Sequence, residues 1–231
     1  QSLTKIELPS SLKTIGNYAF SKCQSLEEIK LPSSLITIGD YAFSKCQSLT
    51  KIELPSLLKT IGNYAFSECN NLCKINIPPN ITSISERIFS QCKSLKKIFI
   101  PHGVTLIKEY AFAGCQISII DIPTSVKSIF EGAFSDCKKL KQVKIPSSVT
   151  LIGSYAFFDC SKINEILIPS SVEEIGNNAF EKCSGLTTLT FQEQSSLKKI
   201  GDSAFSECSK IKNVKIPSDV KEIGNNAFSN C

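Results

Sequence analysis

The residues with the greatest capacity for chemistry in this chain are its cysteines, eleven in 231 residues. Such a set could form disulfides, hold zinc or supply a nucleophilic thiolate. Ten of the cysteines recur at nearly regular intervals, so each is expected to occupy the same position of a repeat and to stack on its copies about 4.8 Å away. This separation permits a disulfide, but the stacked side chains point the same way, which disfavours the geometry of the bridge. We therefore expect a column of buried free thiols, and the redox compartment stays open. Ten cysteines recur at intervals of 22 to 25 residues: Cys23, Cys46, Cys69, Cys92, Cys115, Cys137, Cys160, Cys183, Cys208 and Cys231.

Other constellations that could support catalysis are sparse. A nucleophilic Ser or Cys needs a nearby base, and His102 is the single histidine. It follows Pro101, where most copies carry Ser, and we interpret it as a loop surface residue. The adjacent carboxylates Glu27–Glu28 and Glu173–Glu174 fall at different repeat positions and are expected on solvated surface. We predict no enzyme activity, no catalytic residues, no metal site and no cofactor.

The element that carries each cysteine is a repeat of about 23 residues. The motif Ala-Phe-x-x-Cys recurs along the whole chain, with Ile88 in place of Ala once. A fixed period in this range is typical of a solenoid, in which each unit buries its apolar face only against its neighbours. The recurring aromatic residues are Phe20, Phe43, Phe66, Phe89, Phe112, Phe134, Phe157, Phe180, Phe205 and Phe228.

The copy Leu26–Cys46 shows how one repeat is expected to fold. Alternation around Ile29 and Leu31 predicts a short strand, which the next proline ends because it has no N–H for the ladder. Leu35 and Ile38 are spaced for a second inward segment, a short outer strand. The Asn, Asp or Ser after the repeat glycine is a typical N-cap. Ala-Phe-x-x-Cys is therefore predicted to form one helical or 3₁₀ turn that directs Phe and Cys inward.

The pattern Leu-x-x-Ile-x-Leu-Pro, followed by Leu-x-x-Ile-Gly-x-x-Ala-Phe-x-x-Cys, resembles the BspA-like (Treponema pallidum-type) leucine-rich repeat family over essentially the whole chain. The resemblance implies an α/β fold, a right-handed leucine-rich repeat solenoid of about ten repeats. Its short parallel strands would line the concave side, with the helical or 3₁₀ turns on the convex side. The family also implies surface or secreted proteins of bacteria and parasitic protists, which adhere to host cells and extracellular-matrix proteins without catalysis.

Composition bounds the remaining classes of protein. The net charge of +5, from 26 basic and 21 acidic residues, is too small to predict nucleic-acid binding. No apolar run approaches the roughly 20 residues of a membrane-spanning helix, so we expect no membrane insertion in this segment. Residues 1–231 are predicted to form a single solenoid domain. The chain begins in mid-repeat and shows neither a leader nor polar end caps, so we interpret it as a fragment, uncapped at both ends.

The outward-facing strand residues form columns along the expected concave face. In the first three copies acid and base alternate, an arrangement that stabilises paired strands. In the middle copies Phe99, Ile119 and Leu167 stand where solvent is expected, surrounded by lysines that include Lys96 and Lys141. An exposed apolar group rimmed by charge is typical of an interaction patch; an unused surface, or partial burial by loops, is the alternative. The candidate partner-binding residues are Phe99, Lys97, Ile119, Asp121, Lys144 and Leu167.

Two of these columns contain all six candidate residues. The outward column lies two residues before each strand-ending position and runs Glu7, Lys30, Glu53, Asn76, Phe99, Asp121, Lys144, Leu167, Thr190 and Lys215. The neighbouring column lies two residues earlier and runs Lys5, Glu28, Lys51, Lys74, Lys97, Ile119, Gln142, Glu165, Thr188 and Asn213.

The repeat is irregular at further positions. The repeat glycine is replaced by Ser85, Lys108 and Phe130 in three successive copies. Because a bulky Phe would be strained at positive φ, we interpret the glycine as a packing choice. Cys73, the eleventh cysteine, is expected on an exposed strand, as a plain surface thiol, a reactive thiol or a bridge to another chain. The segment Gln192–Ser196 replaces the usual Pro-Ser-Ser and adds two residues, and such insertions often map to the binding face.

The leading hypothesis is a non-enzymatic protein-binding module of a surface or secreted protein. Its concave face would bind a host-cell or extracellular-matrix protein. One alternative is a structural spacer or self-assembling scaffold whose ends stack on one another. Another is a polyanion-binding surface formed by the lysine columns, whose affinity would depend on salt.

Overall fold

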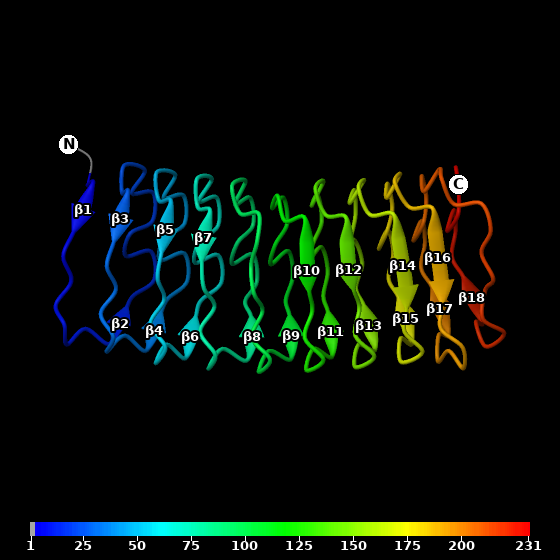
Figure 1. Ribbon diagram of the computed structural model, residues 1–231, viewed down its shortest axis with the longest axis horizontal. Helices are drawn as coiled ribbons and strands as arrows, with labels where there is room; N and C mark the ends of the chain where they lie inside the picture. The colour runs from blue at the N-terminus through cyan, green and yellow to red at the C-terminus, as the bar shows by residue number, and fades with distance from the viewer. Residues whose placement is uncertain (1–2) are drawn as a thin grey trace.

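Two short segments of nearly every repeat lie in β conformation, and each aligns with its copies in the neighbouring coils. The computed structural model describes residues 3–231. It is a parallel β-solenoid of about ten turns, in which the coils follow one another from the N-terminal end to the C-terminal end of a long stack (Figure 1). The stack, its period and its parallel strands agree with the predicted solenoid. The right-handed coiling of the chain and the concave placement of the first strands stay predictions from the resemblance.

The Leu-x-x-Ile-x-Leu segments form the first strand column. It comprises β1 (Lys5–Ile6), β3 (Glu28–Ile29), β5 (Lys51–Ile52), β7 (Lys74–Ile75), β10 (Ile119–Asp121), β12 (Gln142–Lys144), β14 (Glu165–Ile168) and β16 (Thr188–Phe191). The apolar side chains of these segments point into the core, and the residues between them face solvent. All pairings in this column are parallel and keep repeat register, as in Asp121 opposite Lys144.

A second strand column follows each proline turn, as the spacing of Leu35 and Ile38 predicted. It comprises β2 (Thr14–Ile15), β4 (Thr37–Ile38), β6 (Thr60–Ile61), β8 (Ser83–Ile84), β9 (Leu106–Ile107), β11 (Ser128–Ile129), β13 (Leu151–Ile152), β15 (Glu174–Ile175), β17 (Lys199–Ile200) and β18 (Glu222–Ile223). These strands form one three-stranded and one seven-stranded parallel sheet. In Figure 1 both columns run along the length of the stack, the first column above the second in this view.

The predictions of an α/β fold and of a helical or 3₁₀ turn at Ala-Phe-x-x-Cys are wrong, since the described residues contain no helix. In the second copy the N–H groups of Tyr41, Phe43 and Lys45 donate to carbonyls of the next coil, at 2.8 to 2.9 Å. A helix would instead turn these donors back along its own axis. Tyr41 and Lys45 have positive φ angles of 55° and 63°, which direct alternate N–H groups towards the neighbouring coil.

The predicted N-cap residues therefore cap a neighbouring coil and not a helix. The side-chain oxygen of Asn17 accepts a hydrogen bond from the N–H of Asp40 at 2.8 Å, and Asp40 does the same for Asn63 at 2.7 Å. The chemistry is that of an N-cap, in which a short polar side chain satisfies a free backbone donor. Here it stabilises the junction between coils.

Phe and Cys form the centre of the core, as their spacing predicted. The Phe rings stack along the whole column from Phe20 to Phe228, with centroids 5.2 to 5.9 Å apart. Each thiol from Cys46 onward in this column donates to the carbonyl oxygen of the Phe one coil earlier, at 3.1 to 3.2 Å. Burial raises the pKa of Cys46 to about 12, so the thiol stays protonated and keeps this bond.

The repeat glycines lie where neighbouring coils approach closely. At Gly39 a Cβ atom would come within 2.6 Å of the backbone nitrogen of Asn17, although the glycine does not have a positive φ. The interpretation as a packing choice is thus confirmed. Where Ser85 and Lys108 replace the glycine, the Phe rings of those coils are 5.9 and 5.7 Å from the preceding ring, the two widest spacings of the column, whereas the coil in which Phe130 replaces it has an ordinary spacing of 5.3 Å.

A tyrosine column flanks the same turn. Tyr18, Tyr41 and Tyr64 stack with ring centroids 4.7 and 4.4 Å apart. Arg87 takes the next position, and its guanidinium carbon lies 5.6 Å from the Tyr64 centroid and 4.4 Å from that of Tyr110. A cation between two rings is attracted by both, so Arg87 continues the stack in the region where the spacing between neighbouring Phe rings is largest.

Among residues 3–231 there is no helix with the length and apolar character needed to cross a membrane.

Candidate functional site

The outward column changes character between the first coils and the middle coils. Phe99, Ile119 and Leu167 expose 63%, 53% and 51% of their surface, so loops do not bury them as the alternative supposed. Phe99 and Leu167 lie in the outward column, and Ile119 lies in the neighbouring column. Ile119 shares the face of Asp121 on β10, because residues two apart on a strand point the same way. Phe99 occupies the outward position of the preceding coil, where the described structure has no strand.

Charged residues lie between the two apolar members of the outward column. Asp121 and Lys144 are directly opposite one another in the pairing of β10 with β12. Neither forms an ion pair within 4.0 Å among residues 3–231. Both side chains are exposed, so an acid and a base remain available to a partner at neighbouring coils.

In the first coils one pair of opposite charges on this face is formed, and it lies within a single coil and not between neighbouring strands. The Lys51 Nζ atom, on β5, is 2.6 Å from the carboxylate of Glu53, which follows that strand. Their hydrogen bond raises the pKa of Lys51 and lowers that of Glu53. An exposed pair of this kind contributes little to stability. The other charges of the first coils on this face, Lys5, Glu7, Glu28 and Lys30, form no ion pair within 4.0 Å among residues 3–231. The two regions therefore differ in the exposed apolar groups of the middle coils and not in how their charges pair.

A hollow of about 480 Å³ runs along the ends of the middle strands and is called the central hollow. Phe99, Asp121, Lys144 and Leu167 all line it. Four of the six predicted residues thus come together around one space. Its wall contains Pro123, Pro146 and Pro169, the residues at which the strands end.

Two predicted residues lie outside the central hollow. Lys97 and Ile119 are exposed on the neighbouring column, and Ile119 pairs in register with Gln142. They share the face of Phe99 without lining the hollow. Their place in the site is therefore at its edge.

Sequence reasoning missed His102 as a member of the site. Its ring lies edge-on to Phe99, with centroids 5.8 Å apart and planes at 83°, and it lines the central hollow. An edge-to-face pair is a favourable aromatic arrangement. The signal in the sequence was that His102 lies three residues after Phe99, with Pro101 between them, because a residue that follows a proline turn can fold back onto the preceding segment.

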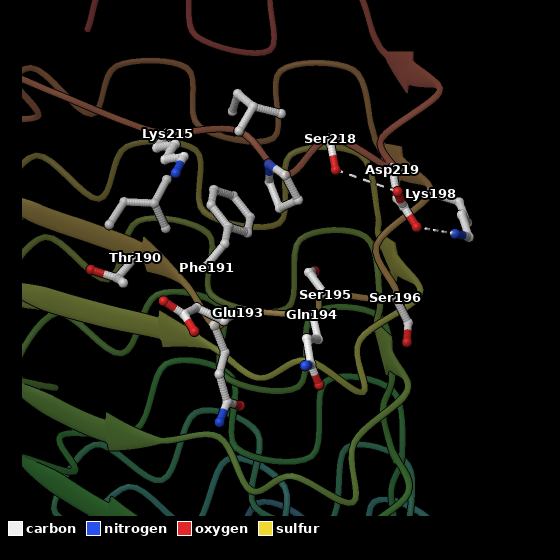
Figure 2. A pocket seen from close by; sticks show the side chains of 14 residues that line it. Thr190, Phe191, Glu193, Gln194, Ser195, Ser196, Lys198, Lys215, Ser218 and Asp219 are labelled. Atoms are coloured by element: carbon white, nitrogen blue, oxygen red, sulfur yellow. Dashed lines mark hydrogen bonds and ion pairs between the residues drawn. The ribbon is translucent and has the colours of Figure 1, made fainter.

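A second hollow, of about 1010 Å³, lies between the insertion loop Gln192–Ser196 and the last coil, and is called the insertion hollow. Phe191 lies near its centre, with Glu193 and Lys215 on one side and the Lys198–Asp219 pair on the other (Figure 2). The Lys198 Nζ atom is 3.3 Å from Asp219. Gln192 lines both hollows, so the two are neighbours along the strand ends.

Comparison with known proteins settles the family. A model described as the BspA type leucine rich repeat region, with six copies, matches residues 1–118 and 105–231. The chain belongs to the BspA-type leucine-rich repeat family. This confirms the resemblance seen in the repeat. A search of curated proteins finds no match to this leucine-rich repeat chain.

Solved structures show the same fold. A leucine-rich repeat protein from Bacteroides ovatus is 24% identical with a TM-score of 0.72, and the match covers 97% of this chain and 69% of that one. A leucine rich cell surface protein from Faecalibacterium prausnitzii is 26% identical with a TM-score of 0.58, over 99% and 79% of the two chains. The pneumococcal vaccine antigen PcpA is 25% identical with a TM-score of 0.59, over 96% and 62%.

The exposed face of this leucine-rich repeat chain presents apolar and charged side chains. Among residues 3–231 no group of three or more His, Cys, Asp or Glu side chains is arranged to hold a metal ion. The column thiols from Cys46 to Cys208 are buried, and Cys73 is exposed as predicted, with its thiol donating to the Thr50 carbonyl at 3.3 Å. Repeat domains of this family are protein-interaction scaffolds, which agrees with an exposed apolar and charged face.

Proposed function

We propose that this chain is a protein-binding module of a surface or secreted protein, and that it adheres to a host-cell or extracellular-matrix protein through the first strand column. The observation that carries the proposal is the exposure of Phe99 and Leu167 on either side of the unpaired Asp121 and Lys144. Aromatic anchors beside polar groups are typical of the residues that dominate interface energies.

The location on a cell surface rests on relatives. One structural neighbour is described as a leucine rich cell surface protein, and the family resemblance points the same way. We also infer that residues 1–231 act as one solenoid domain, because the Phe stack continues without a break from Phe20 to Phe228.

The test is binding to a panel of purified extracellular-matrix proteins by surface plasmon resonance. Phe99→Ala together with Lys97→Ala is expected to weaken binding by roughly tenfold or more, as loss of an interface anchor does. Leu57→Ala is the matched control, because Leu57 exposes 58% of its surface outside the two named columns. Unchanged binding by a folded double variant, or no binding by the parent chain to any member of the panel, would contradict the proposal.

Light scattering over a concentration series separates this function from a self-assembling scaffold. The proposal expects a species whose mass does not change with concentration. Growth of the particles with concentration, unaffected by Phe99→Ala, would favour end-to-end assembly.

A further inference from the structure

The proline turn between the two strand columns contains a position that is Ser in most copies and changes in three successive coils. In regular copies such as those of Ser34 and Ser148, the hydroxyl donates to a carbonyl oxygen of the preceding coil at 2.7 Å, and the side chain is half-buried. In the third, fourth and fifth coils the residues are Leu57, Asn80 and Gly103, and all three are exposed. The surface of the solenoid is therefore different at this edge.

Asn80 begins the sequence Asn80-Ile81-Thr82, which is the single Asn-x-Ser/Thr sequence of the chain. In this pattern the asparagine amide is an acceptor for an N-linked sugar, and the pattern is typical of surface loops of secreted proteins. Proline at the second position would prevent the transfer, and Ile81 stands there instead.

The local fold presents both groups that the pattern requires. Asn80 lies in a tight turn that the Ile81 N–H closes by donating to the Pro78 carbonyl at 3.2 Å. Asn80 and Thr82 are exposed, whereas Ile81 between them is buried in the core. The turn is thus anchored by Ile81 and directs the amide and the hydroxyl to the surface.

The hydrogen bonding of Asn80 is compatible with a substituent on its amide nitrogen. The Nδ2 atom donates to the Ser56 carbonyl of the preceding coil at 2.8 Å. An asparagine amide has two hydrogens to donate, and attachment of a sugar replaces one of them. The modified amide still has one N–H for the Ser56 carbonyl.

The neighbouring coils leave space for a sugar beside Asn80. Gly103, at the same position in the next coil, has no side chain. Leu57, at this position in the preceding coil, exposes 58% of its surface, and the C–H face of a sugar ring can pack against it. Asn80 does not line the central hollow, whose first residues, Phe99 and His102, belong to the next coil. A glycan on Asn80 therefore borders this hollow without filling it.

We propose that Asn80 is the acceptor of an N-linked glycan in a eukaryotic secretory pathway. The donor is an oligosaccharide on a lipid pyrophosphate, and an oligosaccharyltransferase catalyses the transfer. The bond that forms joins the Asn80 Nδ2 atom to the anomeric carbon, and the bond that breaks joins this carbon to a phosphate oxygen. The lipid pyrophosphate leaves, and the amide loses one proton to a base of the transferase. The inference rests on the proposed function because it requires a surface or secreted protein.

The experiment secretes residues 1–231 from a eukaryotic cell line and compares the intact mass before and after treatment with peptide N-glycosidase F. The parent chain is expected to lose a glycan, and the enzyme converts the modified Asn80 to Asp, which identifies the site in a peptide map. Thr82→Val keeps the shape of the side chain without the hydroxyl and should abolish the modification. Thr82→Ser keeps the hydroxyl and should retain it.

Asn76→Gln is the matched control and should leave the glycan in place. The Asn76 amide also donates to a carbonyl of the preceding coil, that of Leu54 at 3.0 Å. Asn76 is exposed like Asn80, but Pro78 stands two residues after it in place of Ser or Thr.

A secreted parent chain without a glycan, or a glycan that persists in Thr82→Val, would overturn the proposal. In the protein from its native source, the peptide that contains Asn80 is expected to carry a glycan, and an unmodified peptide overturns the proposal equally. Matrix binding is measured separately, on chain produced without glycans in bacteria, and depends on Phe99. Failure of that binding is therefore distinguishable from failure of the glycan site.

Discussion

Two regions of the stack share the same inner columns but present different outward residues. Coils 1 to 3 carry Glu7, Lys30 and Glu53 in the outward column, and coils 5 to 8 carry Phe99, Asp121, Lys144 and Leu167. Phe43 and Phe134, one from each region, are completely buried and stack on their neighbours in the same way. Outside, Lys51 and Glu53 pair with one another, whereas Phe99 and Leu167 are exposed beside unpaired charges. The comparison teaches that the repeat specifies the scaffold, while the outward residues, which the repeat leaves free to vary, are the candidates for recognition.

The largest expected effect concerns the thiols that both regions share. Burial raises the pKa of Cys46 and Cys137 from an ordinary value of 9.0 to about 12, so the folded state binds more protons than the unfolded state between these values. This contribution to stability is complete below about pH 9 and is lost as the pH rises towards 12. For each such thiol the free energy of unfolding is expected to fall by up to ~1.4 kcal/mol per pH unit in that window.

Urea unfolding in reductant between about pH 8 and pH 10.5 measures this slope. Cys46→Ala should make the slope shallower, and Cys73→Ser, which removes an exposed thiol, should leave it unchanged. An equal slope for the parent chain and Cys46→Ala would contradict the buried, protonated column.

The next largest effect tests whether the two regions share one core. Phe43→Ala and Phe134→Ala are each expected to lower the free energy of unfolding by about 3–5 kcal/mol, because each removes a completely buried ring and leaves a cavity. Chemical denaturation followed by circular dichroism provides the measurement. A cost below about 1 kcal/mol in either region would show that its core is not packed as described.

A smaller effect distinguishes the coil junctions. Gly39→Ala is expected to cost about 1–3 kcal/mol, because the new Cβ would meet the backbone of the preceding coil. Lys108→Ala, at the same repeat position in a more widely spaced coil, is expected to change stability by less than about 0.5 kcal/mol. The difference between the two denaturation midpoints is the readout, and equal costs would contradict the close approach of the preceding coil at Gly39.

The smallest expected effect on stability belongs to the outward column. Phe99→Ala should change the free energy of unfolding by less than about 0.5 kcal/mol, because the ring is largely exposed. The same denaturation experiment measures it. A loss above about 2 kcal/mol would place Phe99 in the scaffold and not in a recognition surface.

Much of the fold could be predicted because the same apolar positions recur in successive repeats and therefore pack in the same way. The Phe and Cys positions, the strand around Ile29 and the packing role of Gly39 all follow from periodicity and side-chain size. The helical turn could not be excluded in this way. Its backbone donors bond to the next coil, and Tyr41 and Lys45 adopt positive φ without glycine, an arrangement that only the stacked neighbour stabilises.

The strand residues of the candidate site could be predicted from the sequence, but the loop residues that line its hollows could not. Phe99, Asp121, Lys144 and Leu167 could be named because residues one period apart lie on adjacent coils. His102 and Gln192 could not, since their positions depend on how loops fold back at the strand ends. The place of Arg87 between two tyrosine rings likewise depends on contacts between coils.

The most direct test of the central claim converts the middle coils into the pattern of the first coils. Phe99→Lys together with Leu167→Glu would make charges alternate through Asp121 and Lys144, as they do in coils 1 to 3. The account predicts that this double variant keeps the circular dichroism spectrum and unfolding midpoint of the parent chain and loses binding to any matrix protein that the parent chain binds in the surface plasmon resonance panel. Binding at parental affinity by the folded double variant would contradict it.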